Sequence, residues 1–97
     1  MNDAVWIIPW YREPDWPEWC SLCDFDGSHK DWLSRAEAGA KATERPWLTV
    51  VKVIIEPRDF LAWRRNRPGK IRDDERMAYA MWLYASREGG GHAGSVA

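Results

Sequence analysis

The sequence predicts a small α/β domain in which two or three strands carry helices packed on the sheet, in the order strand, helix, strand, helix, helix. Residues 47–55 form a nearly unbroken run of β-branched and large apolar side chains, which is typical of a strand covered on both faces. A second apolar run, residues 4–8, precedes a helical pattern. A helix between two strands favours a right-handed crossover with the strands parallel. An α+β arrangement of the same elements is the alternative.

The first predicted strand, residues 4–8, ends at Pro9 and is expected to pair with residues 47–55. The segment that follows, residues 9–27, contains three prolines among alternating aromatic and acidic residues. This pattern excludes a regular element for most of the segment, because proline removes a backbone donor and restricts the residue before it. We expect one short helical turn at residues 17–22.

The next element is a predicted helix over residues 29–44. Ser28 with Asp31 resembles a capping box, with Asp in place of the usual Glu. Four side chains at helical spacing form a narrow apolar stripe, namely Trp32, Leu33, Ala36 and Ala40. Gly39 weakens the helix by up to about 1 kcal/mol, and we interpret it as a site of close packing against a neighbour.

The central strand interrupts its apolar pattern at Thr49 and Lys52, and Lys52 predicts that one face of the sheet is only partly closed. Pro57 ends the strand and begins a helix, because its missing N–H is tolerated in the first turn. This helix is expected to run to Arg67 and to end at the Pro-Gly pair that follows.

A last helix is predicted over residues 73–88, with Asp73 as its N-cap. This helix has a wide apolar face, which suggests deep burial or self-association. The face contains Met77, Met81, Tyr84 and Ala85. Three successive glycines then stop the helix. We expect a single domain over residues 1–88 and a disordered tail at residues 89–97.

Composition excludes several classes of protein. The 97 residues suffice for one domain, and the net charge of −1 gives no overall attraction to nucleic acid or anionic membranes. No apolar run approaches the ~20 residues of a membrane span, and the start of the chain lacks the features of a signal peptide. We therefore expect a cytoplasmic protein without membrane contact, in which Cys20 and Cys23 are reduced.

An aromatic loop is the first candidate site. The chain has eight tryptophans, and Trp and Tyr are frequent anchors of protein interfaces. The acidic surroundings of the loop suit a basic protein surface better than nucleic acid. The predicted partner-binding residues are Trp10, Tyr11, Trp16 and Trp19. The alternative is that these side chains wrap the edge of the sheet as part of the core.

A basic turn between the last two helices is the second candidate. Its cations are Arg64, Arg65, Arg67, Lys70 and Arg72. Such a cluster can contact phosphates. The helix that follows begins with three acidic residues, so we do not favour base reading by a helix–turn–helix. The alternative is a solvated turn whose charges complement the helix ends.

The third candidate is a C-x-x-C pair. Zinc usually takes four Cys or His ligands, and the pair would need help from a histidine and a carboxylate. The candidate ligands are Cys20, Cys23 and His29. Redox chemistry is the other use of such a pair, and incidental thiols are the simplest interpretation.

No catalytic set is found, because the chain has no Gly-rich phosphate loop, no G-x-S-x-G and no H-E-x-x-H. We predict a non-enzymatic binding or accessory protein without a cofactor, with zinc as the alternative. Its partner is a protein or a second copy of the chain, through the aromatic loop or the last helix. The nucleic-acid and metal or redox hypotheses are the alternatives.

Three segments, W-Y-R-E-x-D-W at 10–16, D-W-L-S-R-A-E at 31–37 and V-V-K-V-I-I-E-P-R-D-F-L-A-W at 50–63, resemble a group of small uncharacterised bacterial proteins. The resemblance covers about the first two-thirds of the chain. After the last of these tryptophans many of the group have a Cys-Arg pair, where this chain has Arg64 and Arg65. The resemblance implies a bacterial origin and no established activity.

Overall fold

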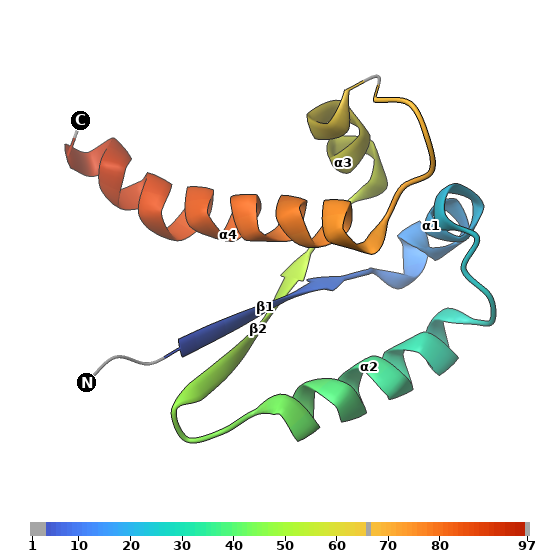
Figure 1. Ribbon diagram of the computed structural model, residues 1–97, viewed down its shortest axis with the longest axis horizontal. Coiled ribbons are helices and arrows are strands. Elements are labelled where there is room, and N and C mark those ends of the chain that lie inside the picture. The colour runs from blue at the N-terminus through green and yellow to red at the C-terminus, as the bar shows by residue number, and fades with distance from the viewer. Residues whose placement is uncertain (1–3, 66, 97) are drawn as a thin grey trace.

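A computed structural model of the chain describes residues 4–65 and 67–96, with side chains described through residue 87. It is a small α/β domain with helices packed on a parallel sheet, as the sequence predicts (Figure 1). The elements in chain order are β1 (Ala4–Trp10), the 3-10 helix η1 (Glu13–Asp15), α1 (Trp16–Cys23), α2 (His29–Thr43), β2 (Leu48–Ile54), α3 (Pro57–Arg64) and α4 (Asp73–Val96).

The sheet consists of β1 and β2 within the described residues, so the crossover through α2 joins two parallel neighbours. Its register pairs Ala4 with Leu48 at one end and Trp10 with Ile54 at the other. This confirms the predicted parallel pairing. β1 continues through Pro9 to Trp10, beyond its predicted end, and the segment after it forms η1 and α1, so residues 9–27 supply no third strand.

The two strands lie between helices. Figure 1 shows α4 along one side of the strands and α2 along the opposite side. On the α2 side, Val50 and Lys52 line a hollow with residues of that helix, and Lys52 remains exposed. Its ammonium lies 4.6 Å from the centre of the Trp10 ring. The α2 face is thus only partly closed, as Lys52 predicts.

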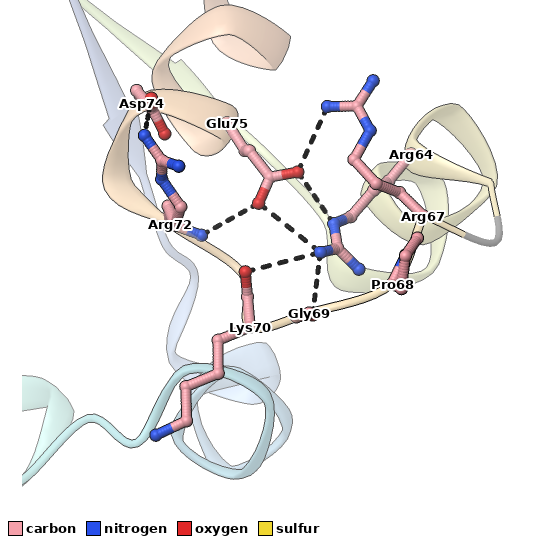
Figure 2. A pocket seen from close by; sticks show the side chains of 8 residues that line it. All are labelled: Arg64, Arg67, Pro68, Gly69, Lys70, Arg72, Asp74 and Glu75. Carbon is pink, nitrogen blue, oxygen red and sulfur yellow. Dashed lines mark hydrogen bonds and ion pairs between the residues drawn. The ribbon is translucent and has the colours of Figure 1, made fainter.

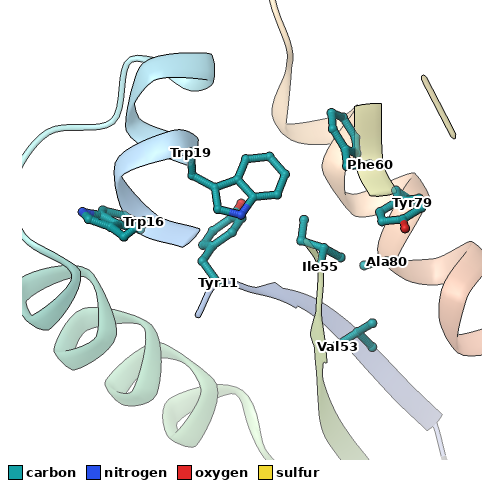
Figure 3. Packing of buried hydrophobic residues seen from close by; sticks show 8 residues of the cluster. All are labelled: Tyr11, Trp16, Trp19, Val53, Ile55, Phe60, Tyr79 and Ala80. Atoms are coloured by element: carbon teal, nitrogen blue, oxygen red, sulfur yellow. The ribbon is translucent and has the colours of Figure 1, made fainter. Parts of the chain in front are cut away.

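The core lies on the other face, where β2 meets α1, α3 and α4. Figure 3 shows its side chains converging from these elements and from the residue that follows β1. The buried cluster consists of Tyr11, Trp16, Trp19, Val53, Ile55, Phe60, Tyr79 and Ala80. Trp19, Ile55 and Phe60 are fully buried.

Local signals explain where the helices begin and end. Ser28 Oγ accepts a hydrogen bond from the Asp31 amide at 3.1 Å, so the predicted cap of α2 is present. α3 ends at Arg64 rather than Arg67, because Arg65 takes a positive φ of 62° that a helix does not accommodate.

Two expectations about glycines differ from the structure. No atom lies within 4 Å of the position that a Cβ at Gly39 would occupy, so this glycine is not a site of close packing. The helical backbone of α4 continues through the three glycines to Val96, beyond the predicted end at residue 88. The disordered tail at residues 89–97 stays a prediction about the protein in solution.

Candidate interaction surface

The backbone of β1 presents one set of polar groups to β2 and another set away from it. The Ala4 amide donates to the Trp47 carbonyl at 2.9 Å, and the Ile55 amide donates to the Trp10 carbonyl at 3.0 Å. In a parallel ladder, alternate residues of a strand direct both polar groups to the same neighbour. The even-numbered residues of β1 therefore face β2, and the odd-numbered residues direct their N–H and C=O groups outward.

The outward groups belong to Val5, Ile7 and Pro9. No backbone hydrogen bond between described residues outside the β1–β2 ladder uses them. Pro9 has no N–H, and proline is tolerated in a strand where that position faces away from the sheet. The outer edge of β1 therefore offers two donors and three acceptors, with the donors confined to Val5 and Ile7.

Two hollows follow this edge. One, of about 280 Å³, is lined by Val5, Trp6, Ile7, Met77 and Met81. The next, of about 300 Å³, is lined by Ile8, Pro9, Tyr11, Trp32, Ala36, Asp73, Arg76 and Met77. Because they share Met77 and take successive residues of β1, they adjoin along β1 beside α4, and only the second is also lined by α2. We call the two hollows together the β1-edge groove.

Large apolar side chains are exposed around the first hollow. The exposed fractions are 44% for Val5, 51% for Trp6, 53% for Met81 and 50% for the neighbouring Trp82. β1 contains no charged residue. Large apolar side chains gathered next to one another at a surface mark interaction sites more often than scattered ones do.

The outer edge of β2 differs from that of β1. Leu48 is already engaged there, because it forms an antiparallel bridge with Arg45. Lys52, with its charged side chain, lies farther along the same strand. A charge on an edge strand and a covering segment both discourage strand addition. Of the two edges, only that of β1 combines an uncharged strand with free polar groups in the described residues.

The aromatic loop is not an exposed platform, which corrects the first predicted site. Tyr11, Trp16 and Trp19 are buried, with exposed fractions of 6%, 7% and 0%. Trp10 is half-buried and contacts Trp32, with ring centres 5.0 Å apart. The reason is that η1 and α1 fold this segment onto the core, so its rings pack against one another instead of facing a partner.

A buried arginine, Arg76, holds this aromatic segment to α4 and was not singled out by the sequence. Its Nε donates to Tyr11 Oη at 2.8 Å, and its Nη1 donates to Cys23 Sγ at 3.3 Å. Nη2 pairs with Asp73, whose side chain is exposed. Burial raises the pKa of Tyr11 to about 12, although the Arg76 guanidinium opposes this effect. The only signal in the sequence is that Arg76 precedes the apolar face of α4.

The basic turn is brought together, but its charges are mostly paired (Figure 2). Arg64 is buried and its Nε donates to Glu75 at 2.9 Å, while its Nη2 donates to the Gly69 carbonyl at 2.9 Å. Arg67 also reaches Glu75, at 3.3 Å. These bonds, that from Arg64 foremost, hold the pKa of Glu75 below its usual range.

Two further cations of the turn, Arg72 and Lys70, also lie beside carboxylates. Arg72 pairs with Asp74 at 2.7 Å, and Lys70 lies 3.5 Å from Asp24. The hollow at this turn has a volume of about 380 Å³. Arg64 holds the turn to α4, and its burial leaves little of its guanidinium for a phosphate. Nucleic-acid binding stays a prediction that would have to use the four exposed cations, Arg65, Arg67, Lys70 and Arg72.

Two of the three predicted zinc ligands, His29 and Cys23, have other partners. His29 Nε2 lies 2.7 Å from the Tyr11 carbonyl, which can only accept, so this nitrogen carries the proton. Cys23 accepts the bond from Arg76, and Cys20 is a free thiol. Burial raises the pKa of both thiols. In the described part of the chain, no three His, Cys, Asp or Glu residues gather as metal ligands would. The zinc alternative stays a prediction.

The described helices include none with the length and hydrophobicity that a bilayer crossing requires. No protein-family model, no curated protein and no solved structure matches this chain. The resemblance of its first two-thirds to small bacterial proteins therefore stays a prediction.

Proposed function

We propose that this chain is a small non-enzymatic protein-binding module whose β1-edge groove takes up an extended segment of a protein. The observation that supports the proposal most directly is the outer edge of β1. There, the outward backbone groups of Val5 and Ile7 lie beside the exposed side chains of Trp6 and Met81.

The chemistry of the groove favours an extended polypeptide over other ligands. Addition of a strand gives affinity through main-chain hydrogen bonds and specificity through pockets for alternate side chains. The two hollows along β1 supply such pockets, and the first is lined by apolar side chains alone. An uncharged edge offers nothing to a phosphate backbone, which relies on cations.

The proposal replaces the aromatic loop with the β1-edge groove as the binding surface of the same kind of protein. A bacterial cytoplasmic accessory role remains part of the proposal, as the sequence resemblance suggests. The basic turn is not chosen, because Glu75 and Asp74 pair with three of its arginines.

A displayed library of random ten-residue peptides, selected on the immobilised protein, tests the proposal. Val5→Pro is the decisive variant, because it removes one outward N–H and leaves every group that faces β2 in place. Trp47→Lys is the control, since Trp47 is 60% exposed and lies at the start of the other strand. Circular dichroism and urea unfolding establish that both variants are folded.

We expect peptides that bind wild type and Trp47→Lys with roughly micromolar Kd. Val5→Pro should bind them about tenfold more weakly, which corresponds to one lost hydrogen bond. Selected peptides that bind Val5→Pro as tightly as wild type would contradict the proposal. So would a selection that yields no peptide specific for the protein.

A further inference from the structure

We infer that the segment taken up by the β1-edge groove is β1 of a second copy, joined antiparallel about a two-fold axis that passes between Trp6 and its symmetry mate. The inference rests on the proposed function and names its partner. The product is a continuous four-stranded sheet with β2 strands at both outer edges and two β1 strands at its centre.

Two-fold symmetry determines the direction of the two strands. A closed homodimer uses the same patch on both copies, so a strand that pairs with itself across the axis must run antiparallel. In an antiparallel pair, residues whose polar groups face each other exchange two hydrogen bonds. Val5 opposite the partner's Ile7, and Ile7 opposite the partner's Val5, would exchange four.

Pro9 selects this register over its neighbour. A shift of two residues would place Ile7 opposite the partner's Ile7 and Val5 opposite the partner's Pro9. Proline has no N–H to donate, so each Val5–Pro9 pair forms one bond instead of two and leaves the Val5 carbonyl without a donor. A shift in the other direction leaves only Val5 paired within the described strand. Only the register centred on Trp6 forms two pairs within the described strand that each exchange two hydrogen bonds.

The exposed side chains fit the same arrangement. Trp6 faces its symmetry mate in a pair without hydrogen bonds, where Cβ atoms lie about 4.5–5.5 Å apart and aromatic pairs are favourable. A two-fold axis perpendicular to the sheet keeps both α4 helices on one face. Met81, which is 53% exposed beside β1, then lies next to the added strand.

The second copy also completes the sheet in a way that the single chain does not. An isolated pair of strands is marginal, and three or more strands are the rule in stable sheets. The uncharged β1 has no charge that would repel its own copy. The outer edge of β2, with its bridge to Arg45 and its charged Lys52, then lies at each side of the dimer. There it limits the addition of further strands.

Sedimentation equilibrium over roughly 1–200 µM chain tests the inference, a range that brackets micromolar association. Wild type should form a dimer, and Trp6→Lys should raise its dissociation constant at least about tenfold. Trp47→Lys is the matched control, because it also places a lysine at an exposed tryptophan but should leave the dimer intact. Val5→Pro provides a second variant should Trp6→Lys fold poorly.

Disulfide trapping tests the register. In a Cys20→Ser, Cys23→Ser background, Trp6→Cys should form an intermolecular disulfide at least about tenfold faster than Ala4→Cys. Both positions lie on the same face of β1. Only Trp6 would lie opposite itself, whereas Ala4 would lie opposite the partner's Ile8.

Several outcomes would overturn the inference, and they separate it from the proposed function. A wild-type monomer throughout the range overturns the dimer; if peptides still bind the edge, the strand-binding module stands with another partner. A dimer that Trp6→Lys and Val5→Pro leave unchanged uses a surface other than β1 and also overturns the inference. Equal trapping of Trp6→Cys and Ala4→Cys overturns the register.

Discussion

Trp19 and Trp47 show, at the level of single residues, how position in the fold decides what a tryptophan does. Trp19 lies on α1 and is fully buried, whereas Trp47 precedes β2 and is 60% exposed. Trp19 contacts Phe60 with ring centres 5.6 Å apart. Its buried Nε1 has no acceptor among the described residues. Trp19 therefore stabilises the fold through apolar packing.

Replacement of Trp19 with alanine should lower the free energy of unfolding by about 3–5 kcal/mol, because it leaves a large cavity in the core. Urea unfolding followed by circular dichroism measures the loss. Trp47→Ala should change the same quantity by less than about 0.5 kcal/mol. If Trp19→Ala is too unstable to measure, Trp19→Phe should show a smaller loss. A Trp19→Ala protein as stable as wild type would contradict the buried position.

At the level of elements, α2 shows which local signals the fold uses and which it does not need. Ser28 caps the helix, and Ala40 is the only buried residue along its length. Gly39 lies beside Ala40, but a Cβ there would meet nothing within 4 Å. The helix therefore retains a glycine that no packing contact requires.

Replacement of Gly39 with alanine should raise the free energy of unfolding by roughly 0.5–1 kcal/mol, since alanine restricts the unfolded chain and suits a helix interior. Urea midpoints of wild type and variant measure the gain. Gly69→Ala is the control with the opposite sign, because Gly69 has a φ of +96° that strains a side chain. A loss of stability in Gly39→Ala would show that something packs against this position.

At the level of the whole molecule, the contact between Tyr11 and Arg76 joins the end of β1 to α4 across 65 positions of sequence. Arg76 also stacks against Phe25, with its guanidinium carbon 4.9 Å from the ring centre. Through these contacts the aromatic segment after β1 becomes part of the core. The phenol of Tyr11 must stay protonated there, because a buried phenolate would lose its hydration.

The stability of the fold should therefore fall at alkaline pH. The pKa of Tyr11 is about 12 in the folded protein, against an ordinary value of 10 for a tyrosine in the unfolded chain. As the pH rises between these values, only the unfolded chain releases the proton, so folding is progressively opposed. The loss should reach roughly 2–3 kcal/mol, at about 1.4 kcal/mol per unit of pKa.

Urea unfolding of wild type and Tyr11→Phe at a series of alkaline pH values measures this loss. Tyr11→Phe should be less stable at neutral pH, because Arg76 loses an acceptor, but its stability should depend less on pH in the alkaline range. Parallel pH profiles for the two proteins would show that Tyr11 does not govern the alkaline loss. Tyr79, whose pKa burial also raises, contributes the dependence that remains in the variant.

Much of the architecture was predictable because its signals are local. The apolar runs of β1 and β2, the helix between them and the Ser28 cap each depend on residues close together in the chain. The basic turn was also recognised, but not its pairing, because Glu75 lies 11 positions from Arg64 and reads as an ordinary first-turn acid. Arg76 was not predicted at all, because its partners Tyr11 and Cys23 are also distant in the sequence.

By itself, the sequence determined the fold class and the start of α2 and favoured a parallel pairing of two strands, since periodicity, propensity and caps act over a few residues. Only the tertiary structure decided that Tyr11, Trp16 and Trp19 are core and that the outer edge of β1 has no backbone partner among the described residues. Burial and free backbone groups depend on which distant segments pack together. Aromatic and basic residues look the same in a sequence whether they stabilise a core or face a partner.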